Sequence, residues 1–391
     1  MTGVKISERQ VIRVAHELGQ ELIEQRDRQV IEQRRRQLLP RTSIIPEAVV
    51  VEVDGGRIRT RAANQGPGVH DAQNKEDKIA ALVTLKSLTF ESDPQPEPPK
   101  SFENPRRVQR LVQQMKGQAG EVLGEKIEEK SEEKREDREA RLEEIEATKR
   151  WSPQKLVRTC IASLASSDAF GPMMAAEAQE RHFYEATRRA FVGDGCAYNW
   201  AIHRGYFPHF EPIVDFLHVL CYVYSSARAV SADETSGWSQ YRQWMRSCWQ
   251  GQVKEVIAEL EVWQERLGRP PKGEAQTAEE RRDPRRLVAE ALGYLTNNET
   301  RMDYPRYRRE GLPTTSSLVE SLVGEFNARV KGKQKHWLRP AGAESILQLR
   351  AAWLSEDERL SRYFANRPGN PFPKKRSSSE KSNHQPIQTA A

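Results

Sequence analysis

The fold is decided by residues 48–62, which read AVVVEVDGGRIRTRA. The first six of them, AVVVEV (48–53), are mostly valine, which is typical of a strand buried on both faces. Asp54-Gly55-Gly56 then predicts a tight turn, and the alternation in RIRTRA predicts a second strand. A third strand is predicted at KIAALVTL (78–85). Three strands with short connections predict an antiparallel meander.

Helix and strand patterns alternate again after residue 150. The patterns predict a strand at KLVRTCIASL (155–164), a helix at about 171–189 and a short strand at RAFVG (189–193). Residues from about 212 to 303 are helical in pattern, and SSLVESLVGEFNARVKG (316–332) predicts a late amphipathic helix. This order predicts an α/β fold, an RNase H-like catalytic domain whose mixed sheet is flanked by helices and interrupted twice.

The same patterns divide the chain into seven segments. We expect an N-terminal helical, candidate DNA-binding segment (1–46), the first part of the RNase H-like core with three strands (47–90), a Pro-rich and charged helical linker or insertion (91–150), the second part of the core (151–218), a helical insertion (219–305), a C-terminal part of the core that carries the third acidic residue (306–365), and a basic disordered tail (366–391).

Composition sets wide limits on location and partners. The 62 basic residues against 56 acidic ones give a net charge of +6, a mild excess that favours a polyanionic partner. No stretch approaches the roughly 18 apolar residues of a membrane helix, and the N-terminus lacks the apolar run of a signal peptide. We therefore expect a cytoplasmic protein that makes no membrane contact. The scattered cysteines, which form no CxxC pair, predict reduced and mostly buried thiols: Cys160, Cys196, Cys221 and Cys248.

Three acidic residues stand where such a fold brings side chains together. Asp54 and Asp194 each end a predicted strand, and Glu320 lies early on the late helix. Each also has a structural explanation, because each aspartate begins an ordinary Asp-Gly turn and Glu320 completes a Ser-x-x-Glu capping box with Ser317. Together they suit a metal centre, since phosphodiester chemistry uses divalent cations held by carboxylates and Mg²⁺ needs few of them.

The late helix adds a separate indication. Glu320, Gly324, Asn327 and Lys331 are spaced to share one face, whereas the apolar residues of this helix occupy another. A stripe of acid, glycine, amide and lysine suits a metal-binding carboxylate followed by contacts to DNA phosphates.

Several segments, in this order, resemble the DDE transposases of the ISKra type, relatives of the Mutator-like group. They are VEVDGGRIRTR (51–61), EDKIAAL (76–82), GDGCAYNW (193–200), YFPHFEPIVDFLHV (206–219), YRREGLPTTSSLVES (307–321), NARVKGKQKHW (327–337) and AESILQLRAAWLS (343–355). The resemblance implies that Asp54, Asp194 and Glu320 are the catalytic, metal-binding triad, with two Mg²⁺ or Mn²⁺ ions per site and no organic cofactor.

The resemblance also implies a role for the Asp215-x-x-His218 signature, in which His218 supports catalysis near the phosphate or the metal ions. Without the resemblance, an Asp–His pair on a helix surface explains these two residues equally well. Expected DNA contacts are Asn327, Arg329, Lys331, Lys333, Lys335 and Trp337. Trp337 either stacks on an unpaired base or serves as a core aromatic residue.

The function implied is metal-dependent cleavage at insertion-sequence ends, followed by strand transfer of the 3′-OH into target DNA. The expected partner is double-stranded DNA, both element ends and target, bound by a homo-oligomer that associates with the nucleoid. Two alternatives stay open: a catalytically inactive, transposase-derived DNA-binding protein, and an RNase H-like nuclease that cuts without joining.

Overall fold

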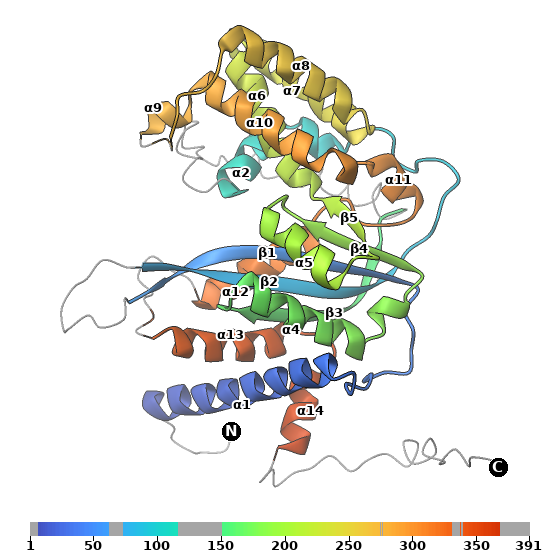
Figure 1. The fold of residues 1–391 in the computed structure, drawn as a ribbon, viewed down its shortest axis with the longest axis vertical. Coiled ribbons are helices and arrows are strands. Elements are labelled where there is room, and N and C mark those ends of the chain that lie inside the picture. The colour runs from blue at the N-terminus through green and yellow to red at the C-terminus, as the bar shows by residue number, and fades with distance from the viewer. Residues whose placement is uncertain are drawn as a thin grey trace, which may run out of the picture.

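The computed structural model describes residues 7–61, 73–115, 151–273, 275, 277–330, 337 and 339–367. It shows an α/β protein in which helices flank a five-stranded mixed sheet (Figure 1), so the coarse fold prediction is confirmed. The charged run at 116–150 and the tail from residue 368 lie outside the described residues. Within the described part, no helix combines the length and the apolar character that crossing a bilayer requires.

The sheet has the strand order β3-β2-β1-β4-β5. β1 pairs antiparallel with β2, and β2 pairs antiparallel with β3. β4 runs parallel to β1, and β5 runs parallel to β4. The strands are β1 (Ala48–Thr60), β2 (Gln73–Lys86), β3 (Gln154–Ser163), β4 (Arg188–Gly193) and β5 (Glu211–Val214). β1 is therefore the central strand, and it joins the antiparallel half of the sheet to the parallel half.

The tight turn predicted at Asp54-Gly55-Gly56 is wrong, because β1 continues through these residues to Thr60. Neither glycine has the positive φ that a two-residue hairpin turn requires. Gly55 instead permits close packing, since a Cβ there would lie 3.1 Å from the carbonyl oxygen of Asp77 and 3.3 Å from the hydroxyl of Tyr198. The described part of residues 47–90 accordingly holds two long strands rather than three.

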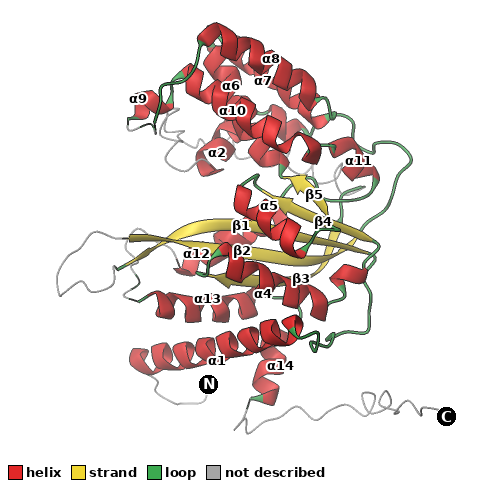
Figure 2. Cartoon of the chain, in the orientation of Figure 1, coloured by secondary structure: helices red, strands yellow, loops and turns green. Residues whose placement is uncertain are grey.

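Helices precede, separate and follow the strands along the described chain. Their bounds are α1 (Glu8–Arg34), α2 (Pro105–Met115), α4 (Ser167–Glu180), α5 (Ala197–Tyr206), α6 (Phe216–Val230), α7 (Glu234–Trp249), α8 (Val253–Leu267), α9 (Ala278–Arg281), α10 (Pro284–Asn298), α11 (Tyr304–Arg309), α12 (Ser317–Val330), α13 (Pro340–Leu354) and α14 (Arg359–Asn366). Short 3₁₀ turns stand at Lys100–Glu103, Phe183–Glu185 and Glu299–Arg301. We call α6 to α11 the helical region; it lies beyond β5 in Figure 2.

Helices cover both faces of the sheet. Tyr198 of α5 packs at Gly55, whereas the amide of Val319 in α12 donates to the Glu52 carboxylate. Because successive residues of a strand point to opposite faces, α5 and α12 lie on opposite sides of β1. On the described apolar face of α12, Val319, Leu322, Phe326 and Val330 are buried, as the sequence predicts.

β5 is absent from the sequence prediction, which begins a helix at about residue 212. The strand is only four residues long and runs into α6 through a single residue, Asp215. The Asp215 carboxylate caps α6 by accepting the Leu217 amide at 3.2 Å. A strand this short, joined so closely to a helix, leaves too few residues for a period-2 pattern to be recognised.

The free edge of β3 is covered by the segment that follows α13. The Glu356 amide donates to the Arg158 carbonyl at 2.8 Å, and the Cys160 amide donates to Ser355 Oγ at 2.9 Å. An exposed edge strand can pair with another chain, so this cover protects the sheet from edge-to-edge association. α1 packs against α13 nearby, and Gly19 permits the close approach, because a Cβ there would lie 2.2 Å from the Ser345 carbonyl oxygen.

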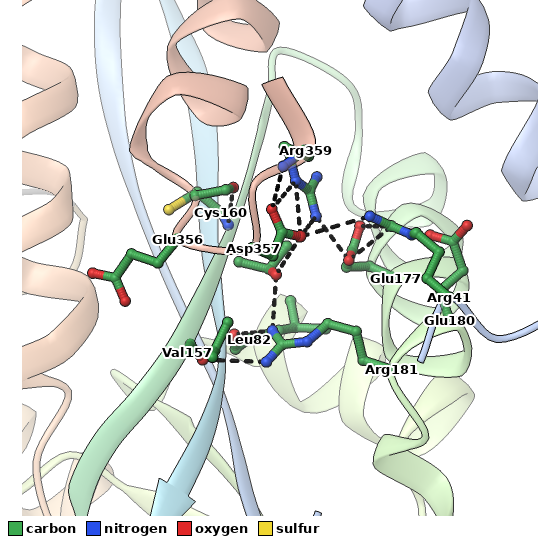
Figure 3. A network of polar contacts seen from close by, with 12 residues as sticks. Arg41, Leu82, Val157, Cys160, Glu177, Glu180, Arg181, Glu356, Asp357 and Arg359 are labelled. Atoms are coloured by element: carbon green, nitrogen blue, oxygen red, sulfur yellow. Dashed lines mark hydrogen bonds and ion pairs between the residues drawn. The ribbon is translucent and has the colours of Figure 1, made fainter. Parts of the chain in front are cut away.

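A network of ion pairs fixes this cover to the body of the protein (Figure 3). Arg359 binds Asp357 through two N–H groups and donates to Glu177 of α4 at 2.8 Å. Arg41 donates to both oxygens of Glu177 at 2.9 Å and also contacts Glu180. Although burial opposes ionisation, the guanidinium groups of Arg359 and Arg41 hold the pKa of Asp357 well below its usual range.

Replacing Arg359 by methionine should lower the free energy of unfolding by about 3 kcal/mol, because the carboxylates of Asp357 and Glu177 would stay buried with less positive charge beside them. Urea denaturation measures the change. Arg228→Met is the control, since Arg228 pairs with Glu234, whose side chain is 74% exposed, and should cost less than about 1 kcal/mol. Equal losses in the two variants would contradict a stabilising role for the network.

Candidate active site

Three aspartates stand side by side where the parallel pairing ends. The last residues in this pairing are Val53 of β1, Gly193 of β4 and Val214 of β5. The next residues are Asp54, Asp194 and Asp215, and the Asp215 amide donates to the Gly193 carbonyl at 2.9 Å. Because parallel strands in register bring equivalent residues together, the three carboxylates lie in one region of the sheet.

Asp54 is held in a setting that disfavours its charge. Its Oδ1 accepts the Gly55 amide at 2.6 Å. Burial raises the pKa of Asp54 to about 6, and the charges of Asp194 and Asp215 add to this rise, while the Gly55 amide and His218 oppose it. A carboxyl group of this kind ionises more readily when a further positive charge comes close.

Asp194 is oriented by donors from its own turn and from α5. Its Oδ1 accepts the Cys196 amide at 2.8 Å and Asn199 Nδ2 at 2.9 Å. Its Oδ2 accepts the Cys196 thiol at 3.1 Å. Gly195 has φ of +93°, a conformation that favours glycine. The Asp194-Gly195 pair thus forms a turn, and the same geometry presents the aspartate carboxylate at the site.

Asp215 and His218 form a hydrogen-bonded pair beside these acids. Asp215 is fully buried, and its Oδ2 accepts His218 Nδ1 at 2.7 Å. Burial alone would lower the pKa of His218, but the Asp215 bond and charge, with Asp194 and Asp54 adding to them, raise it to about 9. His218 is therefore an imidazolium at neutral pH, and its side chain is 22% exposed. It supplies positive charge next to the carboxylates.

The helix that carries Glu320 is anchored to the same place. The Ser316 amide donates to Asp215 Oδ1 at 3.0 Å, and the Val319 amide donates to Glu52 Oε2 at 2.8 Å. Glu52 is fully buried, and a carboxylate at a helix N-terminus is favoured by the helix dipole. These two bonds fix the first turn of α12 beside β1 and thus place the backbone of Glu320 near the aspartates. The Glu320 side chain lies outside the described residues.

The predicted DNA contacts are described only in part. Lys331, Lys333 and Lys335 lie outside the described residues, as do the side chains of Asn327 and Arg329. Trp337 forms a bridge with Thr60 beside the end of β1, and its indole Nε1 donates to the Val330 carbonyl at 3.0 Å. This tryptophan therefore has a structural role, and its stacking on an unpaired base stays a prediction.

Sequence reasoning missed Glu52 and Asn199, which position the other groups. Glu52 is a single charged residue in a run of valines, and a charge in a buried strand is the signal that could have revealed it. Asn199 carries no such signal, because its bond to Asp194 depends on how α5 packs. As predicted for the thiols, all four cysteines are free, and Cys160, Cys221 and Cys248 are buried, whereas Cys196 is exposed next to Asp194.

The donor set fits a hard divalent cation. Asp54 and Asp194 offer carboxylate oxygens, the ligands that Mg²⁺ prefers. Asp194 Oδ1 accepts two N–H donors, whereas Oδ2 accepts the Cys196 thiol, which is a weak donor, so Oδ2 is the oxygen better placed to bind an ion. The described side chains alone contain no group of three or more His, Cys, Asp or Glu arranged to hold a metal. A complete ligand set would need a further carboxylate, and Glu320 is the residue whose backbone the fold brings there.

No protein-family model matches this sequence, and no curated protein matches it.

The charge on His218 should make stability depend on pH. Because its pKa is raised from 6.5 to about 9, the imidazolium stabilises the fold below about pH 6.5, and this contribution is lost as the pH rises through 9. The loss should be at most about 3 kcal/mol. We expect the stability difference between wild type and His218→Gln, measured by urea denaturation, to shrink between pH 6 and pH 9.5.

His203→Gln serves as the control for this pH series. Burial lowers the pKa of His203, so any pH dependence of its replacement should have the opposite sign, with the wild-type advantage growing and not shrinking as the pH rises. A wild-type advantage over His218→Gln that stays constant from pH 6 to pH 9.5 would contradict the imidazolium assignment.

Proposed function

We propose that this chain is a DDE-type transposase of the ISKra-like group, which cuts DNA at insertion-sequence ends and joins the ends to target DNA. One observation carries the proposal. Asp54 and Asp194 directly follow the paired residues Val53 of β1 and Gly193 of β4, and hydrogen bonds to Glu52 and Asp215 anchor the first turn of the Glu320 helix beside them. The backbones of three acidic residues from distant parts of the sequence therefore lie near one another, which supports the proposal.

We also propose that the sheet is an RNase H-like core. The supporting features are a central β1, two neighbours on its antiparallel side, two parallel strands on the other, and helices on both faces. In this arrangement Asp194 and Asp215 follow the carboxyl ends of β4 and β5, where open α/β sheets place their ligand sites, and Asp54 of β1 is aligned with them. The helical region stands between the second and the third acid in the sequence, so the core is assembled from separate segments.

Each polar group has a role in the proposed reaction. Bound divalent cations would supply an activated hydroxyl or water and would stabilise the leaving oxygen. Asp54, Asp194 and Glu320 would hold the cations through carboxylate oxygens. His218, kept protonated by Asp215, balances part of this negative charge and can donate a hydrogen bond to a phosphate oxygen. Asn199 and Glu52 act by orienting Asp194 and α12.

A cleavage and strand-transfer assay tests the proposal. The substrate is DNA that carries the repeats flanking the gene, with Mg²⁺ or Mn²⁺ present. Asp194→Asn and Glu320→Gln should each reduce both products by about 1,000-fold or more, because a metal-binding carboxylate contributes several kcal/mol to the transition state. Asp168→Asn and Glu325→Gln are matched controls at exposed acids of α4 and α12, and both should keep wild-type activity.

The products separate the alternatives. Joined products that require Asp194 and Glu320 would support a transposase. Cut but unjoined products would instead indicate a nuclease, and salt-sensitive DNA binding that survives loss of both acids, with no cleavage by wild type, would indicate an inactive DNA-binding protein.

A further inference from the structure

The turn that carries Asp194 is also held from the helical region. The Tyr294 hydroxyl, from α10, donates to the Asp194 carbonyl oxygen at 3.0 Å. The Tyr294 ring lies directly against the next residue, since a Cβ on Gly195 would be 2.5 Å from Tyr294 Cε2. The Tyr294 side chain thus holds the backbone carbonyl of Asp194. Its ring also leaves no room for a side chain at position 195.

Tyr294 is itself held in place by a second tyrosine. Its ring stacks on Tyr222 of α6 with centroids 3.9 Å apart and an interplanar angle of 18°. Tyr222 follows His218 by four residues, so both lie on the same face of α6. The helix that presents the imidazolium to the site therefore also supports the tyrosine that holds Asp194.

A hydrogen-bond relay fixes α10 to α5. Trp200 Nε1 of α5 donates to Asn298 Oδ1 at 3.0 Å, and Asn298 Nδ2 donates to the Tyr294 carbonyl at 2.9 Å. The residue before Trp200 is Asn199, which donates to the Asp194 carboxylate. Asp194 is thus held by α5 at its side chain and by α10 at its backbone, and the two helices are tied to each other.

We propose that Tyr294 is a positioning residue for the second aspartate, through which the helical region completes the active centre. The proposal rests on the proposed metal-dependent function. By holding the Asp194 carbonyl, Tyr294 fixes the turn, so that the Cys196 amide and Asn199 occupy Oδ1, and Oδ2, which accepts the weakly donating Cys196 thiol, is the oxygen that would bind the cation. Loss of the phenol hydroxyl lets the turn rotate and weakens cation binding.

Tyr294→Phe tests this inference in the full chain, with Mn²⁺ as the probe. Free Mn²⁺ measured by electron paramagnetic resonance gives the dissociation constant. We expect Tyr294→Phe to weaken binding about five-fold, the factor that corresponds to one ordinary hydrogen bond. Tyr241→Phe is the matched control, because it also removes a buried phenol bond to a backbone carbonyl (Phe102, 2.9 Å) from the helical region, and it should leave Mn²⁺ binding unchanged.

Amide hydrogen exchange of residues 193–199 provides a readout that needs no metal. Tyr294→Phe should speed exchange in this segment about five-fold, whereas Tyr241→Phe should not. Unchanged exchange and unchanged Mn²⁺ affinity in Tyr294→Phe, or equal losses in the two variants, would overturn the inference.

Failure of the proposed function would look different from failure of this inference. Mn²⁺ binding by wild type that persists in Asp194→Asn would reject the metal site. In that case the exchange rates still decide whether Tyr294 holds the turn.

Discussion

The parallel pairing of β1 with β4 is the constraint on which the rest of the structure depends. Its register aligns Val53 with Gly193 and so places Asp54 and Asp194 next to each other. A slip of one residue would turn every side chain of β1 to the other face. Asp54 would then point towards α5, and Glu52 could no longer accept the amide of Val319. The hairpin of β1 and β2 and the addition of β5 extend the sheet from this pair of strands.

The site concentrates negative charge in a half-buried place, which opposes folding. The raised pKa of Asp54 reflects this unfavourable burial and repulsion of negative charge. The imidazolium of the Asp215–His218 pair offsets part of the repulsion. Hydrogen bonds to helix amides offset a further part of this repulsion. The Asp215 carboxylate caps α6, and the Glu52 carboxylate binds an amide in the first turn of α12. Stability and the arrangement for chemistry thus come from the same contacts. Bound cations would remove the remaining repulsion.

Several parts of this arrangement can be predicted from local sequence. The valine run of β1, the short strand before Asp194 and the apolar face of α12 follow from periodicity alone. The Asp-Gly dipeptide gives opposite results at its two occurrences. At residues 194 and 195 it forms a turn, whereas at 54 and 55 it continues a strand, because Gly55 packs under Tyr198. Because the dipeptide is identical at both places, tertiary packing decides whether it forms a turn or continues a strand.

The supporting contacts could not be predicted, because their partners are distant in sequence. Glu52 binds an amide 267 residues away, and Tyr294 binds a carbonyl 100 residues away. No local pattern encodes such pairs, since each exists only once the sheet and the helical region have packed. The candidate acids are visible in the sequence, whereas the groups that orient them are visible only in the structure.

The most direct test of the central claim, that Asp54, Asp194 and Glu320 share a metal site, is the anomalous scattering of Mn²⁺ in crystals of the protein. The account predicts anomalous peaks within coordination distance, about 2–2.5 Å, of carboxylate oxygens from all three residues. Mn²⁺ bound elsewhere, or Glu320 directed away from a site formed without it, would contradict the account.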